Sequence, residues 1–254
     1  MRRIIVAPLA DAQPGVPADG PALERGEALR QIDGPRAPIH LTAYRLEPGG
    51  RIDWPASSRC RTLFVRAGEV VMGVRRFGPD SLIVIEADAT AQAQAGESGA
   101  DLLEFRHNRG DEARHGGAVH GIEGSAVPAL GHDDLTSAIH ADAGCAGCGV
   151  WMHSNHIPKE GVTLDLHSHT EDEVIVVMEG EMIAGPRHLG PGTALSVAKD
   201  TLYTFSVGKG GLRFINFRPS RPGYIAHGSD EVRDELSIYT AMGLRPAAHE
   251  PIHT

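Results

Sequence analysis

Residues 161–180 read GVTLDLHSHTEDEVIVVMEG, and two histidines in this stretch, His167 and His169, stand two positions apart in an alternating apolar run. In an extended strand, residues i and i+2 point to the same face, so both imidazoles can converge on one point. Glu173 follows a short polar turn and opens a β-branched apolar run that predicts a second strand. Two imidazoles and one carboxylate on adjacent strands form a ligand set for a divalent first-row metal, with positions open for water, substrate or dioxygen.

The spacing of this stretch resembles the first metal-binding motif of the cupin superfamily. The matching residues are Gly161, His167, His169, Glu173 and the pair Glu179-Gly180. The second motif of that family is matched in part, by Gly190-Pro191-Gly192 and an apolar run over 194–198, but Tyr203 stands where cupins carry a histidine. The resemblance implies a β-barrel that holds its metal through His167, His169 and Glu173. A phenol is a poorer ligand than imidazole because its pKa is about 10, so Tyr203 either coordinates the metal directly or hydrogen-bonds a metal-bound water or substrate.

An internal repeat determines the expected architecture. An offset of 112 residues pairs Gly68-Glu69 with Gly180-Glu181, Gly78-Pro79 with Gly190-Pro191, and Phe105-Arg106 with Phe217-Arg218. Gly49, Arg75 and Asp88 match Gly161, Arg187 and Asp200 at the same offset. The chain is therefore predicted to be all-β, with two tandem cupin barrels of the double-stranded β-helix or jelly-roll type, which is a bicupin.

The expected organisation has five parts. Residues 1–38 form an N-terminal arm with a short helical pattern over 23–31, and residues 39–106 form the first barrel. A linker over 107–148 precedes the second barrel at 149–220, and a tail with helical character follows over 221–254. The helical pattern of the tail covers 230–242 and ends at Gly243, a suitable C-cap residue.

The repeat also predicts which barrel holds the metal. Positions 112 residues before the four candidate ligands carry Pro55, Ser57, Arg61 and Ala91. None of these is a good ligand for a divalent metal, so the first barrel is expected to lack a metal of this type. We expect it to serve packing or oligomerisation, or to bind an anion through Arg59 or Arg61. The alternative is that Arg61 is an ordinary surface arginine.

The linker carries two cysteines in the sequence Cys145-Ala-Gly-Cys148. Two thiols at this spacing bind zinc or act as a redox pair in other proteins, and His153 and His156 follow nearby as further ligands. The spacing of zinc ribbons and the flanks of thioredoxin-like motifs are missing, which favours unliganded structural thiols. The linker histidines are interpreted as solvated loop residues; they are His115, His120, His132 and His140.

Composition excludes several classes of partner. The 254 residues include 31 Gly and 17 Pro but only 5% aromatic residues, which is typical of many short strands and turns. The formal net charge of −9 argues against nucleic acid and anionic membrane as partners. No apolar run is long enough to span a bilayer, and the first residues lack a signal-peptide core. Three cysteines do not form a disulfide framework, so we expect a reduced, cytoplasmic protein.

Alternation from the ligand strands predicts the residues that line the substrate pocket. These are Asp165, Ile175, Val177, Phe205 and Phe217. The pocket is expected to be apolar with the metal as its polar anchor. Tyr203 and Asp165 are the candidate catalytic groups; Asp165 is a base, a hydrogen-bond partner of a ligating histidine, or an ordinary strand residue.

The resemblance implies a metal-dependent enzyme, with an oxygenase acting on a small chelating substrate, phenolic or diketone-like, as the leading interpretation. One divalent metal per chain is expected, iron first, with manganese, nickel or zinc as alternatives. A non-redox isomerase, decarboxylase or hydrolase uses the same ligands, and a small-ligand-binding module without turnover is a further alternative. Cupins often pair, so a homodimer is expected.

Overall fold

The computed structural model describes residues 4–107, 117–132 and 134–253, which form mainly antiparallel strands. The chain divides into two compact units. The first-barrel unit comprises residues 11–127, 144–148 and 247–254, and the second-barrel unit comprises residues 1–10, 128–143 and 149–246. In the part of the chain that is described, no helix is long and apolar enough to cross a membrane.

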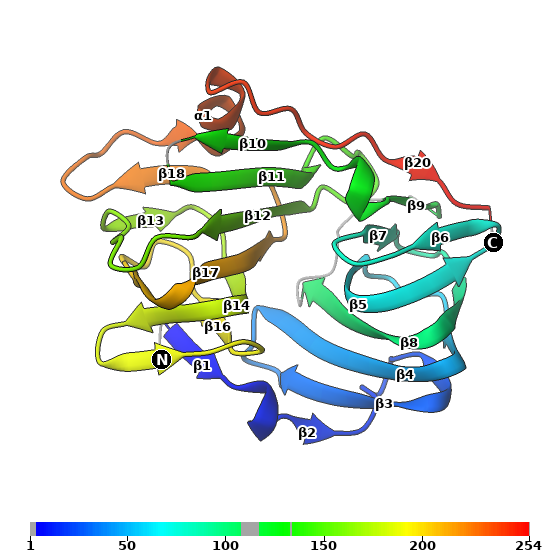
Figure 1. Ribbon diagram of the computed structural model, residues 1–254. Helices are drawn as coiled ribbons and strands as arrows, with labels where there is room; N and C mark the ends of the chain where they lie inside the picture. The colour runs from blue at the N-terminus through cyan, green and yellow to red at the C-terminus, as the bar shows by residue number, and fades with distance from the viewer. Residues whose placement is uncertain (1–3, 108–116, 133, 254) are drawn as a thin grey trace. The chain divides into compact units, whose positions relative to one another are not determined.

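The first-barrel unit is a nine-stranded sheet in the order β2-β3-β4-β8-β5-β7-β9-β20, with β6 paired to β5 (Figure 1). Its strands are β2 (Gln13–Pro14), β3 (Ala22–Ile32), β4 (Ile39–Trp54), β5 (Arg61–Met72), β6 (Arg75–Phe77), β7 (Leu82–Ile85), β8 (Ala91–His107), β9 (Val119–Ile122) and β20 (Glu250–Pro251). A 3-10 helix, η2 (Gly124–Ala126), follows β9. The core of the first-barrel unit contains fully buried side chains, among them Trp54, Leu63, Val65 and Phe77.

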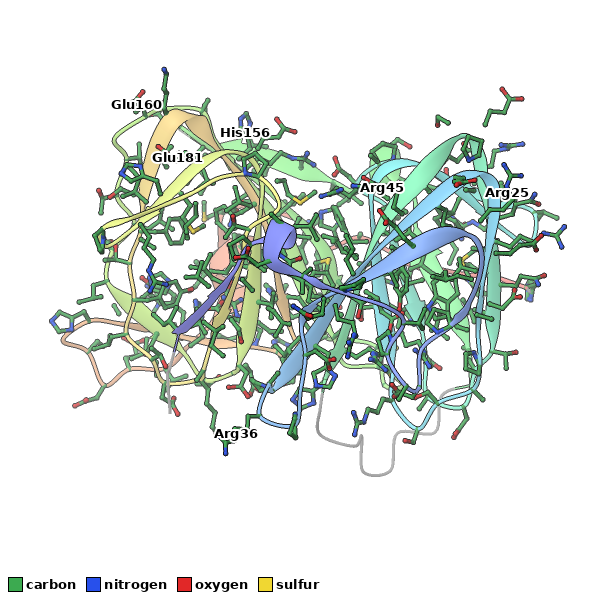
Figure 2. The ribbon with its side chains drawn as sticks, turned by 90° about the horizontal axis from the view of Figure 1, so that it is seen from below. Arg25, Arg36, Arg45, His156, Glu160 and Glu181 are labelled. Atoms are coloured by element: carbon green, nitrogen blue, oxygen red, sulfur yellow. The ribbon has the colours of Figure 1, made fainter. Side chains whose placement is uncertain are left out.

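The second-barrel unit contains an eight-stranded sheet and a three-stranded sheet. The larger one has the order β1-β16-β14-β17-β12-β11-β10, with β15 on β14, and the smaller one is β13-β18-β19. The strands of the larger sheet are β1 (Ile4–Ala7), β10 (Ala129–His132), β11 (Leu135–Asp142), β12 (Trp151–Ile157), β14 (Glu173–Ala184), β15 (Arg187–Leu189), β16 (Ala194–Val197) and β17 (Ser206–Arg218). Those of the smaller sheet are β13 (His167–His169), β18 (Gly223–Ala226) and β19 (Arg233–Asp234). Figure 2 shows the side chains that fill the space enclosed by each curved sheet.

The repeat predicted from the sequence is confirmed at the level of whole strands. β5, β6 and β7 have the same bounds as β14, β15 and β16 when 112 residues are added to both ends. Gly68 and Gly180 occupy matching bulges with φ of 70° and 71°. A Cβ atom on either glycine would lie 2.1 Å from the carbonyl oxygen of Gly99 or 2.0 Å from that of Gly211. Glycine is therefore required at both positions.

Two strands, β1 and β9, differ from the expected domain boundaries. β1 pairs with β16 in the second-barrel unit, with Ile4 opposite Val197, although it lies in the expected N-terminal arm. β9 pairs with β7 in the first-barrel unit, with His120 opposite Val84, although it lies in the expected linker. The linker also supplies β10 and β11 to the second-barrel sheet. The linker segments have few large apolar side chains, and pairing with neighbouring strands makes them β structure, whereas β1 is itself apolar.

The helix expected over residues 23–31 was a wrong prediction, because these residues belong to β3. Ala, Leu, Glu and Arg favour helices intrinsically, but pairing with β4 overrides this weak preference. A bulge between Glu24 and Gly26, with Arg25 at φ of 58°, interrupts the strand.

The helix expected in the tail is confirmed as α1 (Glu235–Ala241). Asp234 caps its N-terminus by accepting a hydrogen bond from the Ser237 amide, and Gly243 follows its end with φ of 97°. The helix starts later than expected, because residues 230–232 are irregular and 233–234 form β19; the tail also contributes β18 and β20 to the sheets.

Candidate functional site

His167 and His169 are buried on β13, and Tyr203 lies beside them. The His167 amide donates to the Tyr203 carbonyl oxygen at 3.1 Å, and the Tyr203 amide donates back to the His167 carbonyl at 2.9 Å. The ring centroids of His167 and His169 are 5.0 Å apart, and those of His167 and Tyr203 are 4.6 Å apart. The structure therefore brings together three of the four side chains that the sequence proposed as ligands.

Both imidazoles use Nδ1 for a contact inside the protein. His167 Nδ1 lies 2.6 Å from the carbonyl oxygen of Asp165, and His169 Nδ1 lies 3.2 Å from Glu235 Oε2. Because a carbonyl oxygen only accepts, His167 carries its proton on Nδ1. His169 Nδ1 is buried close to the Glu235 carboxylate but makes no hydrogen bond of good geometry with the described residues. Histidines that bind metals generally donate their other ring N–H to such acceptors. Nε2 is then the nitrogen of each ring that is left for a ligand.

Glu173 is buried at the start of β14, and its carboxylate is held on one side only. Glu173 Oε2 accepts hydrogen bonds from Asn216 Nδ2 at 2.7 Å, Arg218 Nη2 at 2.8 Å and Arg218 Nε at 3.1 Å. Glu173 Oε1 has no hydrogen-bond partner among the described residues. An unpartnered buried carboxylate oxygen is costly unless a further group binds it.

Arg218 connects this carboxylate to a second one. Its Nη1 donates to both oxygens of Glu235, at 3.1 and 3.0 Å. Burial alone would raise the pKa of Glu173 and of Glu235, but the Arg218 guanidinium holds the pKa of both carboxyl groups below the usual value. Two carboxylates and one guanidinium leave one net negative charge in a buried site, which favours the binding of a cation.

Two further ionisable groups of the site, Tyr203 and His153, stay neutral. Burial raises the pKa of Tyr203 well above its usual value, and the nearby Glu173 carboxylate acts in the same direction. Burial also lowers the pKa of His153 to about 3. Tyr203 is therefore a neutral phenol that can donate a hydrogen bond, and His153 is a neutral imidazole.

A cavity of about 360 Å³ opens beside these groups. Of the residues predicted from the sequence, it is lined by Asp165, His167, His169, Ile175, Tyr203 and Phe205. Asp165 is an exposed residue, and its main-chain oxygen, rather than its carboxylate, is the partner of His167. Glu235, Tyr239 and Arg233 complete the polar lining.

Two predicted pocket residues do not line this cavity. Val177 packs in the core of the second barrel, and Phe217 points to the other side of its strand. On β17 the cavity is lined by Phe214, Asn216 and Arg218, which are even-numbered positions. Gly210 and Gly211, with φ of 81° and 82°, interrupt the alternation that starts at Phe205, so odd and even positions exchange faces after them.

The predicted ligands do not meet as closely as a bound metal requires. Among the described residues, the one group of three His, Cys, Asp or Glu residues whose ligand atoms lie within 4.8 Å of one another is His120, Cys145 and Cys148. In the second barrel, Arg218 and Asn216 hold the Glu173 carboxylate, so that it does not line the cavity. The donor types and the orientation of both imidazoles nevertheless fit a divalent metal. The side chains would have to close around the ion.

Comparison with known proteins supports the fold. No protein-family model and no curated protein sequence matches the chain. The oxalate decarboxylase of Lactobacillus farciminis in complex with formate matches with a TM-score of 0.70 and 10% identity, over 95% of this chain and 94% of that one. A variant of Bacillus subtilis oxalate decarboxylase matches with a TM-score of 0.66 and 11% identity, over 94% of this chain and 84% of that one. A structure described as a glyoxylate-induced protein from Pseudomonas aeruginosa matches with a TM-score of 0.67 and 11% identity, over 85% of this chain and 89% of that one.

The chain has a bicupin fold. At these identities the likeness concerns the fold alone, and it confirms the all-β architecture of tandem cupin barrels predicted from the repeat.

The first barrel of this bicupin contains a different charged cluster at the matching place. Arg61, at the position equivalent to Glu173, is buried, and its Nη1 lies 3.3 Å from Glu104 Oε1. Arg106, the repeat equivalent of Arg218, lies 3.0 Å from the same oxygen through Nε. The interpretation of Arg61 as a surface arginine was therefore wrong. The two arginines pair with Glu104, and Arg106 also pairs with Asp19, so the cluster carries no excess negative charge that would attract a metal cation.

Sequence reasoning missed Arg218, Glu235 and Asn216. The repeat paired Arg106 with Arg218, each directly after a phenylalanine. This arginine, present in both halves of the chain, could have been predicted as a site residue. Glu235 had no such signal, because its side chain reaches the site only through the fold of the tail.

Proposed function

We propose that this bicupin is a metal-dependent enzyme that acts on a small substrate in the cavity of the second barrel. The observation that carries the proposal is the arrangement of donors. His167 Nδ1 is hydrogen-bonded to the Asp165 carbonyl oxygen, His169 Nδ1 lies 3.2 Å from Glu235 Oε2, and Glu173 Oε1 is buried without a hydrogen-bond partner among the described residues. These three groups would hold one divalent metal, as histidines and carboxylates do in other metal sites.

Such a metal, when bound, supplies Lewis acidity and open positions for a chelating substrate and dioxygen. The residues of the chain orient and protect the site. Arg218 fixes the Glu173 carboxylate, and Glu235 fixes the His169 ring. Ile175, Phe205 and Phe214 form apolar walls that exclude water.

The polar groups of the cavity indicate the substrate class. Arg233 lines the cavity from an exposed position and offers a guanidinium to an anionic oxygen. Tyr203 is a neutral hydrogen-bond donor beside the Glu173 carboxylate. Together with an apolar wall, these groups suit a small substrate that chelates through two oxygens, such as a phenolic or diketone-like compound. We propose oxygenation of such a substrate, with iron, as the reaction.

Two observations favour other candidates. The fold relatives include oxalate decarboxylases, which makes decarboxylation of a small carboxylate, without net oxidation, the second reaction class. Glu173 is bound to Arg218 instead of facing the histidines, and this favours a module that binds a small ligand in the cavity without a metal.

Metal analysis of matched variants tests the proposal. His169→Ala should lose one metal equivalent per chain relative to wild type. Ser57→Ala, at the equivalent position in the first barrel, should lose none. Oxygen consumption with diketone and phenolic compounds, and carbon dioxide release from oxalate, then separate the two reaction classes. If wild type and His169→Ala bind equal amounts of iron, manganese, nickel and zinc, the enzyme proposal fails and the ligand-binding module replaces it.

A further inference from the structure

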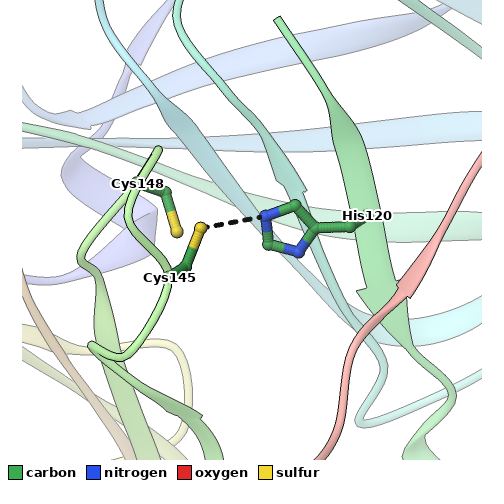
Figure 3. Close-up of side chains that lie close together, drawn as sticks. All are labelled: His120, Cys145 and Cys148. Carbon is green, nitrogen blue, oxygen red and sulfur yellow. Dashed lines mark hydrogen bonds between the residues drawn. The ribbon is translucent and has the colours of Figure 1, made fainter. Parts of the chain in front are cut away.

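A second group of potential ligands lies in the first-barrel unit, and it shares no residue with the cavity described above. His120 comes from β9, and Cys145 and Cys148 come from one loop that belongs to the same compact unit (Figure 3). Their ligand atoms all lie within 4.8 Å of one another. Cys148 is 3% exposed, and the His120 side chain is 13% exposed, so water has little access to the group.

Glu86, directly after β7, places a carboxylate beside Cys145 and His120, although it does not belong to the group whose ligand atoms all lie within 4.8 Å of one another. Glu86 Oε1 lies 3.3 Å from Cys145 Sγ and 3.5 Å from His120 Nε2. Cys145 Sγ and His120 Nε2 are 3.6 Å apart. Sulfur, nitrogen and oxygen ligands on one tetrahedral zinc ion are separated by roughly 3.3–3.8 Å, given their bond lengths to the metal. All three measured separations fall in this range.

The loop backbone is shaped to reach the carboxylate. A Cβ atom on Gly147 would lie 2.2 Å from Glu86 Oε1, so a larger residue there would displace the Glu86 carboxylate from its present position. Ala143 and Gly149, on either side of the loop, both have φ of 60°. Glu86 Oε2 accepts a hydrogen bond from the Ala118 amide at 3.1 Å, which leaves Oε1 directed at the thiol and the imidazole.

A further residue orients the imidazole. His120 Nδ1 lies 2.8 Å from His249 Nδ1, a distance at which one of the two nitrogens donates to the other. Donation by His120 leaves its Nε2 as the nitrogen that faces Cys145, as metal-binding histidines require.

We propose that His120, Cys145 and Cys148, with Glu86 as the fourth ligand, bind one zinc ion in the first-barrel unit. Two thiolates select a borderline-soft ion such as zinc over magnesium or calcium. Each thiol releases its proton to solvent when the ion binds. Four protein ligands close the coordination sphere, and this is the arrangement of structural rather than catalytic zinc. The site stabilises the 144–148 loop against β9 and the turn after β7.

Cobalt and zinc titration of the reduced full-length protein tests this site. Cobalt(II) bound by thiolates gives an intense charge-transfer absorption that histidine–carboxylate sites lack, so the second-barrel site does not interfere. We expect this absorption in wild type and in His169→Ala. We expect it to disappear in the double variant Cys145→Ser/Cys148→Ser, and zinc should displace cobalt and abolish it in wild type.

Cys60 provides the matched control. Its Sγ donates to the Gly147 carbonyl oxygen at 3.4 Å, so it lies beside the same loop but outside the ligand group. Cys60→Ser keeps a hydrogen-bond donor there and should leave the absorption unchanged. His249→Phe should weaken zinc binding by roughly tenfold to a hundredfold, the usual effect of removing a group that orients a ligand.

The absence of thiolate absorption in reduced wild type would overturn the proposal without the need for any variant. So would its persistence in the double cysteine variant, or a Cys145–Cys148 disulfide that survives mild reductant in excess zinc. Glu86→Gln tests the fourth ligand separately: zinc affinity should fall, and an unchanged affinity would overturn the assignment of Glu86. Failure of the zinc-site proposal leaves the second-barrel proposal intact, because the second-barrel proposal is tested by the metal content that His169→Ala loses relative to wild type.

Discussion

Arg218 is the only arginine that the structure places between Glu173 and Glu235 in the described residues, and it is buried with both of them. Removing one partner from a buried ion network leaves the others uncompensated, which typically costs about 3–5 kcal/mol. We predict that Arg218→Met lowers the free energy of unfolding by about this amount, as measured by urea denaturation. Arg221→Met is the control, because the exposed pair between Arg221 and Asp234 should contribute less than about 1 kcal/mol. Equal losses in the two variants would contradict the prediction.

The same network predicts a dependence of stability on pH. The folded-state pKa of Glu173 and of Glu235 is lowered, so in acid the unfolded state binds more protons than the folded state. The network therefore contributes fully above the unfolded glutamate pKa of about 4.3 and is lost as the pH falls through the folded-state values. We expect unfolding free energy to decrease with falling pH below about 4.3. The slope should be shallower in Arg218→Met, and parallel slopes would argue against this origin.

Tyr203 separates two roles that the sequence left open. Since the phenol is neutral and buried beside Glu173, we predict that it acts as a hydrogen-bond donor rather than as a metal ligand. Tyr203→Phe should keep the metal equivalent that His169→Ala loses. Turnover or ligand affinity should fall by roughly tenfold to a hundredfold. A loss of metal as complete as in His169→Ala would identify Tyr203 as a direct ligand instead.

Individual site residues were predictable where the local chain determines them. His167, His169 and Tyr203 were found because a two-residue spacing on a strand and a family resemblance both depend on neighbouring positions. Arg218 and Glu235 were missed because their roles depend on contacts between separate elements, β17 and α1. The sequence suggested His153 and His156 as companions of Cys145 and Cys148, whereas the structure supplies His120 and Glu86.

At the level of the elements, the bulges at Gly68 and Gly180 explain why the repeat keeps these glycines. Both have positive φ, and a Cβ atom would clash with the facing strand. We predict that Gly68→Ala and Gly180→Ala each destabilise their own unit by about 2 kcal/mol or more. Gly78→Ala and Gly190→Ala are the matched controls, because nothing lies within 4 Å of a Cβ there, and they should cost less than about 0.5 kcal/mol. Thermal unfolding of the four variants would check this.

Strands with continuous apolar runs were predictable: β5 and β14 both bury their first five residues, and β7 and β16 both bury all four. Strand β3 could not be predicted, because its helix-favouring composition does not indicate the pairing with β4. Phe217 was wrongly predicted to line the pocket, where Phe214 lies instead, because of a local shift in the strand. Two glycines with positive φ shift the alternation, and this conformation is not encoded in a hydrophobic pattern.

At the scale of the whole molecule, substitutions in β1 test whether the stability of the second-barrel unit depends on a strand that is distant in sequence. Val6 sits opposite Leu195 and packs against the core of that unit, whereas Ile5 sits opposite Ser196 and is 40% exposed. We predict that Val6→Asp lowers amide-exchange protection of β14 and β16 but not of β5 and β7, because an unpaired charge would enter one core only. Ile5→Asp should have little effect. A uniform loss of protection in all four strands would contradict the prediction.

The pairing of β1 with β16 also has a consequence for the order in which the protein is made. Ile4 meets Val197, so 193 residues (197 − 4) separate them, and a ribosome adding 5–20 residues each second needs about 10–40 s to cover that distance. During this time β1 is a short unpaired segment of only four residues, which offers little to aggregate with. β16 consists of four consecutive buried residues and would be the edge of the sheet without β1, so it is the more aggregation-prone of the two strands. Its partner β1 has already been synthesised when β16 leaves the ribosome. The edge that would otherwise recruit a neighbouring chain can therefore be covered as soon as it forms.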